Sequence, residues 1–266
     1  MTVHSPSPRT YNAVNWVGLW TLYRKEVYRF LKVHTQTISA PVVTTLLFYA
    51  VFALALGGAV RQVGGVPFLE FLGPGLVMMA MAQNAFANTS SSVVIAKVQG
   101  NIVDVLMPPL SALELGLGYV LGGITRGVLV GVVTAVAISL FVPMPLSHPL
   151  YILYHGVMAC MLLSLLGLIG GIWSEKFDHI AAVTNFVVTP LSFLSGTFYS
   201  IDSLPEGWRF VAHLNPFFYM IDGFRYGFIG QTDGTTGTGL IVMALTNLAL
   251  WALALRMLHT GYKLKA

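Results

Sequence analysis

The side chains that could exchange protons gather in one stretch, residues 193–230. It contains Asp202, Glu206, His213 and Asp222, the types of group that general acid–base catalysis uses. They favour one alternative, a membrane-embedded enzyme with an external active site. The other motifs argue against catalysis: the seven histidines are scattered, and no H-E-x-x-H sequence is present.

Nucleotide chemistry is not expected in this chain. The run "GTTGTG" lacks the lysine with which a P-loop holds phosphates. We therefore predict no cofactor here, neither ATP nor Mg²⁺. The single Cys160 lies in an apolar run, which excludes an internal disulfide and favours a small buried residue.

The composition indicates an integral membrane protein. Hydrophobic residues make up 56% of the 266 residues and charged residues only 9%, whereas soluble domains carry about 25% charged residues. Six apolar runs have the length that a membrane helix needs, about 20 residues. They are Thr35–Gly58, Phe68–Val93, Leu113–Phe141, Leu150–Trp173, His179–Ser200 and Thr238–Met257. The prediction is an all-α, six-span protein.

The basic residues predict how these spans are oriented. If the spans alternate, ten Lys and Arg side chains fall on the side of the termini and three, Arg61, Arg209 and Arg225, on the other. The positive-inside rule then places both termini in the cytoplasm. We expect the protein in the inner membrane of a bacterial cell. No apolar leader occurs near the amino terminus, so we expect it to be retained.

The segment Trp16–His34 predicts an amphipathic helix at the membrane surface. On a helical wheel Trp20, Tyr23 and Phe30 lie within about 60° of Trp16. The charged side chains Lys25, Glu26, Arg29 and Lys32 lie opposite. We therefore divide the chain into a tail with this helix, residues 1–34, and a membrane domain, residues 35–266.

Two spans carry polar stripes. Asn84 and Asn88 are four residues apart on the second, and Asn185, Thr189 and Ser192 share a face of the fifth, where Pro190 favours a kink. Such side chains either bond neighbouring helices or line a translocation path, and the sequence leaves both readings open.

Arg126 is a charged residue that stands well inside the third span. Counting from Phe141, we expect it several ångströms from the inner membrane edge, where its side chain would reach the interface or a phosphate.

The connector after the second span predicts a short cytoplasmic helix. Asn101 would begin it and Pro108 would stop it. An apolar-tipped helix of this kind either fits a groove in another protein or rests on the bilayer. The residues concerned are Gly100, Asn101, Ile102, Asp104, Val105, Leu106, Met107 and Pro108.

The stretch 196–229 predicts two short amphipathic helices on the outside. Pro205 would start the first, and Asn215 followed by Pro216 would start the second. In the second helix Phe217, Ile221 and Phe224 recur at helical spacing, with Arg225 on another face. We interpret the pair as a re-entrant hairpin that closes the outer end of a path.

These segments together resemble the permease subunits of type-2 ABC exporters, which include drug, lipo-oligosaccharide and polysaccharide permeases. "FLGPGLVMMAMAQNAFANTSSS" and "GNIVDVLMPPLSALELGLGYVLGGITRG" resemble the family's second span and coupling region. "FLSGTFYSIDSLPEGWRFVAHLNPFFYMIDGFRYGFIG" resembles its most recognisable segment. The resemblance covers nearly the whole chain.

The resemblance implies a homodimer with two separate ATPase chains, which would bind ATP and Mg²⁺. Residues 100–109 would be the coupling helix, and spans two and five would face the dimer axis. The expected substrate is amphipathic (a drug, a lipid or a lipid-linked saccharide), and no nucleic-acid partner is expected. A non-catalytic membrane scaffold is the remaining alternative.

Overall fold

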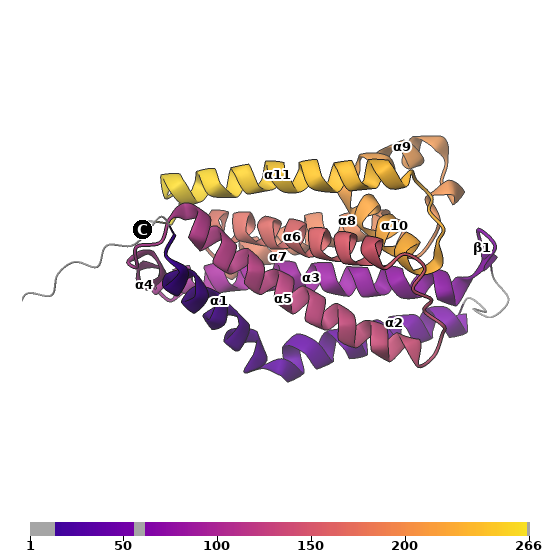
Figure 1. Ribbon diagram of the computed structural model, residues 1–266, viewed down its shortest axis with the longest axis horizontal. Coiled ribbons are helices and arrows are strands. Elements are labelled where there is room, and N and C mark those ends of the chain that lie inside the picture. The colour runs from indigo at the N-terminus through magenta and orange to yellow at the C-terminus, as the bar shows by residue number, and fades with distance from the viewer. Residues whose placement is uncertain (1–13, 56–61, 265–266) are drawn as a thin grey trace, which may run out of the picture.

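The computed structural model describes residues 14–55 and 62–264, which form an elongated bundle of helices (Figure 1). Predictions for Arg9, Gly58, Arg61 and Lys265 lie outside these residues. The long helices run along the bundle axis. They are Ala40–Ala55 (α2), Phe68–Val98 (α3), Ala112–Ser139 (α5), Pro149–Trp173 (α6) and Thr236–Thr260 (α11).

Five segments of the described chain are long and apolar enough to cross a membrane. They are Thr35–Ala55, Ala112–Ser139, Pro149–Trp173, Phe177–Leu194 and Thr236–Thr260. The expectation of an all-α membrane protein is confirmed. A sixth span stays a prediction, because α3 is more polar than the others although its 31 residues extend about 46 Å.

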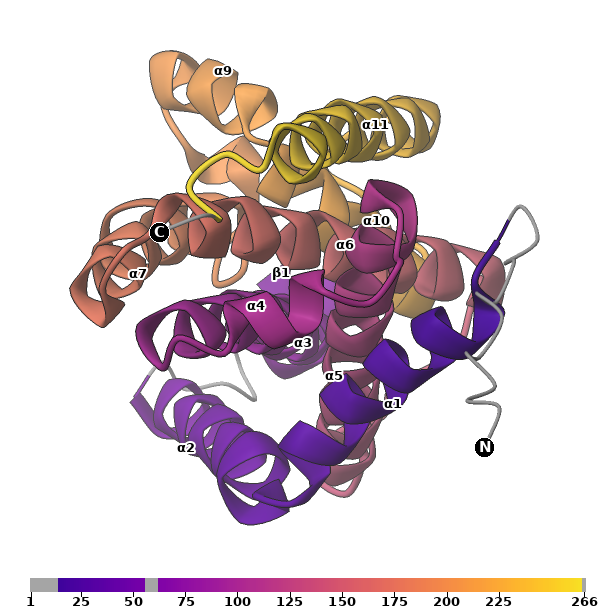
Figure 2. The ribbon, with the colours of Figure 1, turned by 90° about the vertical axis from the view of Figure 1, so that its left-hand side faces the viewer.

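The central position of α3 explains its polarity. Most of its side chains are buried, and Figure 2, which looks along the bundle, shows α2, α5 and α6 around it. A helix whose faces are covered by protein does not need lipid-compatible side chains. The polar residues of α3 are therefore compatible with a place inside the bundle.

Glycines on α5 and α6 let these helices approach α3 closely. A Cβ atom on Gly127 of α5 would lie 2.9 Å from the carbonyl oxygen of Met81 and 2.6 Å from Sγ of Cys160. On Gly167 of α6 it would lie 2.5 Å from the carbonyl oxygen of Phe86. Small residues at such crossings are typical of membrane helices. Cys160 is fully buried there, as its apolar surroundings predicted.

Two π turns directly precede helices that have a proline at their second residue. Thr35–Ser39 (η1) ends two residues before Pro41, and Thr184–Val188 (η2) ends two residues before Pro190. Proline lacks the N–H that an α-helix uses and clashes with the preceding turn, so a wider turn relieves both problems. The fifth segment is consequently Phe177–Val183 (α7), η2 and Thr189–Leu194 (α8).

The short elements divide between the two ends of the bundle (Figure 1). Ile102–Leu106 (α4) and the end of α11 lie at one end. The hairpin of Gln62–Val63 (β1) and Val66–Pro67 (β2) lies at the other, with Glu206–Leu214 (α9) and Pro216–Ile229 (α10); the short helix Ile201–Ser203 (η3) precedes α9.

Two lysines stabilise the end of the bundle where α4 lies. Nζ of Lys97 donates to the carbonyls of Ile172 and Ser174, both at 2.6 Å, where the last carbonyls of α6 need partners. Nζ of Lys263 lies 2.9 Å from Oε1 of Glu175. This contact holds the pKa of Glu175 below its usual range and raises the pKa of Lys263.

The amino-terminal helix Trp16–Leu31 (α1) lies at the predicted place, but one residue of its charged face is buried. Trp16 and Trp20 are 71% and 61% exposed, whereas Glu26 is completely buried. The helical wheel places Glu26 with the charged side chains opposite the aromatic face. Its carboxylate is buried because it has partners on α1 itself and on α3, and because Gly122 of α5 leaves room for its stem.

Candidate translocation cleft and coupling helix

A cleft of about 400 Å³ lies between α3 and the fifth segment. Six of its lining side chains are polar, and four are apolar. The polar ones are Gln83, Asn84, Ser90, Ser91, Thr184 and Thr189, and the apolar ones are Phe86, Ala87, Ile180 and Val188. The cleft thus joins residues from both of the polar stripes that the sequence singled out.

The structure places the members of each polar stripe in different surroundings. Asn84 and Thr189 line the cleft, whereas Asn185 is exposed and is not part of its wall. Ser192 is buried and donates to the carbonyl of Val188 at 2.7 Å. Asn88 is completely buried under α1. Within this chain, Asn88 and Ser192 therefore bond backbone or neighbouring helices.

Arg126 lies at the middle of α5 and points into the bundle. Its side chain is 9% exposed, and Nη2 donates to Oδ1 of Asn84 at 2.9 Å. The sequence predicts that this guanidinium reaches the inner interface. It instead stands behind the cleft wall, about 21 Å along the helix from Ala112. Asn84 accepts this bond and donates to the carbonyl of Ala80 at 3.0 Å.

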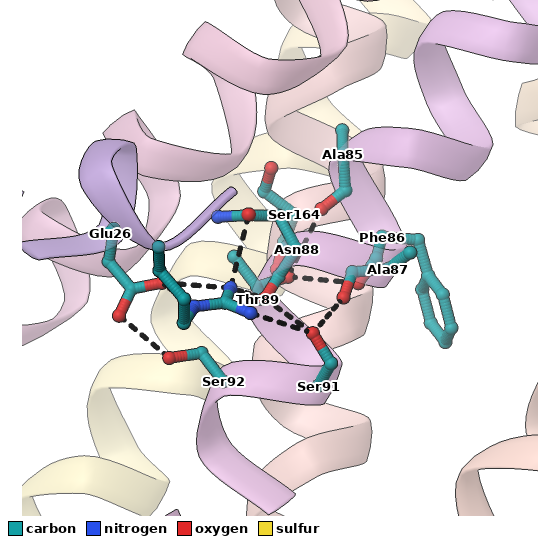
Figure 3. A network of polar contacts seen from close by, with 10 residues as sticks. Glu26, Ala85, Phe86, Ala87, Asn88, Thr89, Ser91, Ser92 and Ser164 are labelled. Carbon is teal, nitrogen blue, oxygen red and sulfur yellow. Dashed lines mark hydrogen bonds and ion pairs between the residues drawn. The ribbon is translucent and has the colours of Figure 1, made fainter. Parts of the chain in front are cut away.

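A second arginine reaches the same helix from α1. Arg29 pairs with Glu26 at 3.1 Å and donates to the backbone carbonyl of Asn88 at 2.6 Å and to its Oδ1 at 3.1 Å. It also donates to Oγ of Ser91 at 3.2 Å, and Ser92 donates to Oε1 of Glu26 at 2.7 Å. Figure 3 shows this network between α1 and α3. We call Glu26, Arg29, Asn88, Ser91 and Ser92 the α1–α3 seam.

Sequence reasoning missed the seam and most of the cleft, of whose ten lining residues it named only Asn84 and Thr189. Ser91 stands seven residues after Asn84, so helical spacing could have added it to that stripe. Glu26 gave no such signal, because a lone acid among basic residues is usually solvated. Its role depends on α3, which lies some sixty residues further along the chain.

The helix α4 is shorter than the predicted segment 100–109. It begins after Gly100, whose φ of +75° suits glycine, and ends before Pro108. Asn101 occupies the N-cap position, but its side chain accepts no bond from the helix. Ile102 is buried against α5, α6 and α11, whereas Met107 is 75% exposed.

The exposed surface of α4 differs in part from the expected one. Ile102 faces inward and Val105 is half-buried, so the outward surface consists of Val103, Asp104, Leu106 and Met107. A cavity of about 520 Å³ separates α4 from α1, with Asp104 and Lys25 in its wall.

The start of α1 is attached to the loop after α4. Nδ2 of Asn15 donates to the carbonyl of Pro109 at 3.2 Å, and its backbone N–H donates to Oε1 of Glu114. Glu114 also completes a capping box with Ser111 at the start of α5. A displacement of α4 would therefore reach α1 through this loop.

At the opposite end, α9 and α10 differ strongly in burial. Pro205 precedes α9, which exposes Trp208 and Phe210, so its apolar face is open. Oδ1 of Asn215 caps α10 by accepting from the N–H of Phe217 at 3.0 Å, with Pro216 at the first position. Two helices at the predicted places are thus present.

Helix α10 packs inside the chain rather than lying open. Phe217, Ile221 and Phe224 are buried in the main core. Arg225 is buried as well: its guanidinium donates to the carbonyls of Phe71 at 3.2 Å and Gly196 at 2.7 Å, and it stacks 3.7 Å over the Phe71 ring. Arg225 therefore fixes α10 to α3 and to the end of the fifth segment.

The acids and histidine of the enzyme alternative each have a structural role or an exposed place. Asp222 accepts from Oγ1 of Thr232 at 2.5 Å and from the N–H of Asp233 at 2.8 Å, and so holds the loop after α10. Asp202 lies 3.7 Å from Arg209, and His213 packs edge-on to the ring of Phe218. Glu206 is exposed in the first turn of α9. Among the described residues no group of three His, Cys, Asp or Glu could hold a metal ion.

Comparison with known proteins identifies the family of this chain. The model of the ABC-2 type transporter family matches residues 17–229. The chain is 36% identical over 251 residues to the inner membrane transport permease YadH of Escherichia coli K12, covering 94% of this chain and 98% of that one. It is 25% identical over 221 residues to nodulation protein J of Rhizobium leguminosarum bv. trifolii, covering 82% and 83%. The nodulation protein J of Rhizobium meliloti is 23% identical over 221 residues, with 83% of each chain covered. The chain therefore belongs to the ABC-2 type transporter family and is a multi-pass membrane permease.

Proposed function

We propose that this chain is the membrane-spanning subunit of an ATP-driven exporter of an amphipathic substrate. A separate ATPase chain would bind ATP and Mg²⁺, and two copies of the permease would form the path between them. The carrying observation is α4: a short helix at the end of the bundle, anchored by Ile102, with apolar side chains turned outward. A helix of this kind suits a groove in a partner protein.

The contacts of α4 suggest how ATP hydrolysis could drive transport. Closure of the ATPase pair would push α4, and the bonds of Asn15 to Pro109 and Glu114 would carry that displacement to α1. The α1–α3 seam would then act on the wall of the cleft through Ser91. Coupling requires that two states of the permease bind the ATP-closed partner unequally.

Helices α9 and α10 form the proposed external gate, and each copy of the permease contributes to the proposed path the cleft between α3 and the fifth segment. The mixture of polar and apolar side chains in the cleft suits an amphipathic substrate. In the proposed orientation of the bundle in the membrane, α4 and both termini face the cytoplasm, as the distribution of lysine and arginine predicts.

The test is co-purification with a candidate ATPase, followed by substrate-stimulated hydrolysis. Met107→Asp, at the exposed C-cap of α4, should weaken the complex at least tenfold, since a carboxylate would be desolvated in an apolar groove. Met107→Leu keeps the apolar surface and is the matched control. Undiminished pairing and hydrolysis with Met107→Asp would show that α4 is not the coupling element.

A further inference from the structure

Among the residues that the structure describes, the charge of Arg126 has no counter-ion. Within residues 14–55 and 62–264 the structure contains no ion pair of Arg126, and its Nε has no hydrogen-bond partner. Guanidinium groups keep their proton in proteins. A buried charge inside a membrane protein is costly and is typical of a functional site.

The other charges near this position do not neutralise it. Arg29 and Glu26 are paired with each other across one turn of α1. The three groups Glu26, Arg29 and Arg126 therefore carry one net positive charge beside α3. In surroundings of low polarity an uncompensated charge acts strongly on anything that enters nearby.

Both arginines contact the cleft wall from behind. Arg126 donates to Oδ1 of Asn84, and Arg29 donates to Oγ of Ser91, while both acceptors also line the cleft. The positive charge thus stands one side chain away from the cavity. Phe86, Ile180 and Val188 supply an apolar wall beside these polar groups.

We infer that the cleft between α3 and the fifth segment binds the anionic head group of an amphiphile, with Arg126 supplying the compensating charge. The ligand class is an alkyl or acyl chain that ends in a phosphate or carboxylate. This inference makes the substrate class of the proposed function more specific. It rests on the proposed function only for the direction of transport. Arg126 acts through Asn84 and is a positioning residue.

The experiment uses the full-length permease in phosphatidylcholine nanodiscs. An alkyl phosphate with a photoreactive tail labels the protein, and labelled peptides are assigned to α3 and residues 177–194 by mass spectrometry. Three amphiphiles with the same tail compete: dodecyl phosphate, dodecyl maltoside and dodecyltrimethylammonium. Dodecyl phosphate should displace the probe at a concentration about tenfold lower than the other two, because only its charge is attracted.

Substitutions of arginine test which charge causes the preference for dodecyl phosphate. Arg126→Gln should abolish the advantage of dodecyl phosphate, and Arg126→Lys should retain it, which a merely structural role would not predict. Arg256→Gln, at an exposed arginine of α11, is the control and should change nothing. Equal displacement by the three amphiphiles, or an unchanged advantage in Arg126→Gln, would overturn the inference.

A second pair of variants keeps Arg126 intact. Thr184→Phe fills the cleft and should abolish labelling, whereas Asn185→Phe, one residue along and outside the wall, should leave it unchanged. Inorganic phosphate should not compete, because it lacks a tail; competition at equal concentration would contradict an amphiphile site. ATPase stimulation is measured in parallel on the complex of each variant with the partner ATPase, so loss of head-group preference with intact stimulation rejects this inference alone.

Discussion

At the scale of single residues, the α1–α3 seam links a surface helix to the wall of the cleft. Glu26 is completely buried, and Arg29 retains partial exposure, so the pair is only partly shielded from solvent. Its geometry is supported by Ser92 on one side and Asn88 on the other. A buried pair of this kind specifies where α1 sits on α3.

Glu26→Ala should destabilise the protein by about 2–3 kcal/mol, because it leaves Arg29 beside α3 without its counter-ion. In a double-mutant cycle the double variant Glu26→Ala, Arg29→Ala should cost less than the sum of the single variants. Thermal unfolding in detergent measures both. Lys25→Ala, on the exposed side of α1, is the control; strict additivity would mean that the pair is not coupled.

At the scale of elements, close helix crossings depend on glycine. Gly127 and Gly116 both belong to α5, but their surroundings differ. A Cβ on Gly127 would meet a backbone oxygen of α3, which cannot move alone, whereas on Gly116 it would lie 3.4 Å from the end of Leu258. Alanine substitutions at the two positions therefore distinguish the effect of helix propensity on stability from the effect of packing.

Gly127→Ala should cost about 1–3 kcal/mol, since α3 and α6 must both shift to admit the methyl group. Gly116→Ala should be neutral or stabilising by up to about 1 kcal/mol, because alanine favours a helix and its contact there is ordinary. Melting temperatures in detergent compare the two variants. Equal effects would show that α5 does not pack as tightly as described.

At the scale of the whole molecule, the proposal assigns the two ends of the bundle to opposite sides of the membrane. The natural chain is well suited to a test, because its single cysteine, Cys160, is completely buried. New cysteines can be placed at exposed positions of α4 and α9 without competing thiols.

Asp104→Cys should react with a membrane-impermeant maleimide only after the cells are opened, and Glu206→Cys should react in intact cells. Both positions are exposed, at opposite ends of the bundle. The measurement is mass-tagging of each variant, with the unsubstituted chain as the blank. Labelling of both positions in intact cells would contradict an arrangement with α4 inside.

The sequence by itself determined the class of protein and the location of most helices. Long uncharged runs require membrane helices because unpaired backbone groups are too costly in lipid, and Gly100 and Pro108 bound α4 by local backbone chemistry alone. Asn215 and Pro216 begin α10 for the same local reason.

Only the tertiary structure decided what each polar side chain contacts. Asn84 and Asn88 share a helix face by spacing, yet one lines the cleft and the other lies under α1. Likewise, Arg126 meets Asn84 and Glu26 lies inside because of helices distant in the chain. Helical spacing sets the angle of a side chain about its own axis, whereas its neighbour depends on which other helix packs against that face.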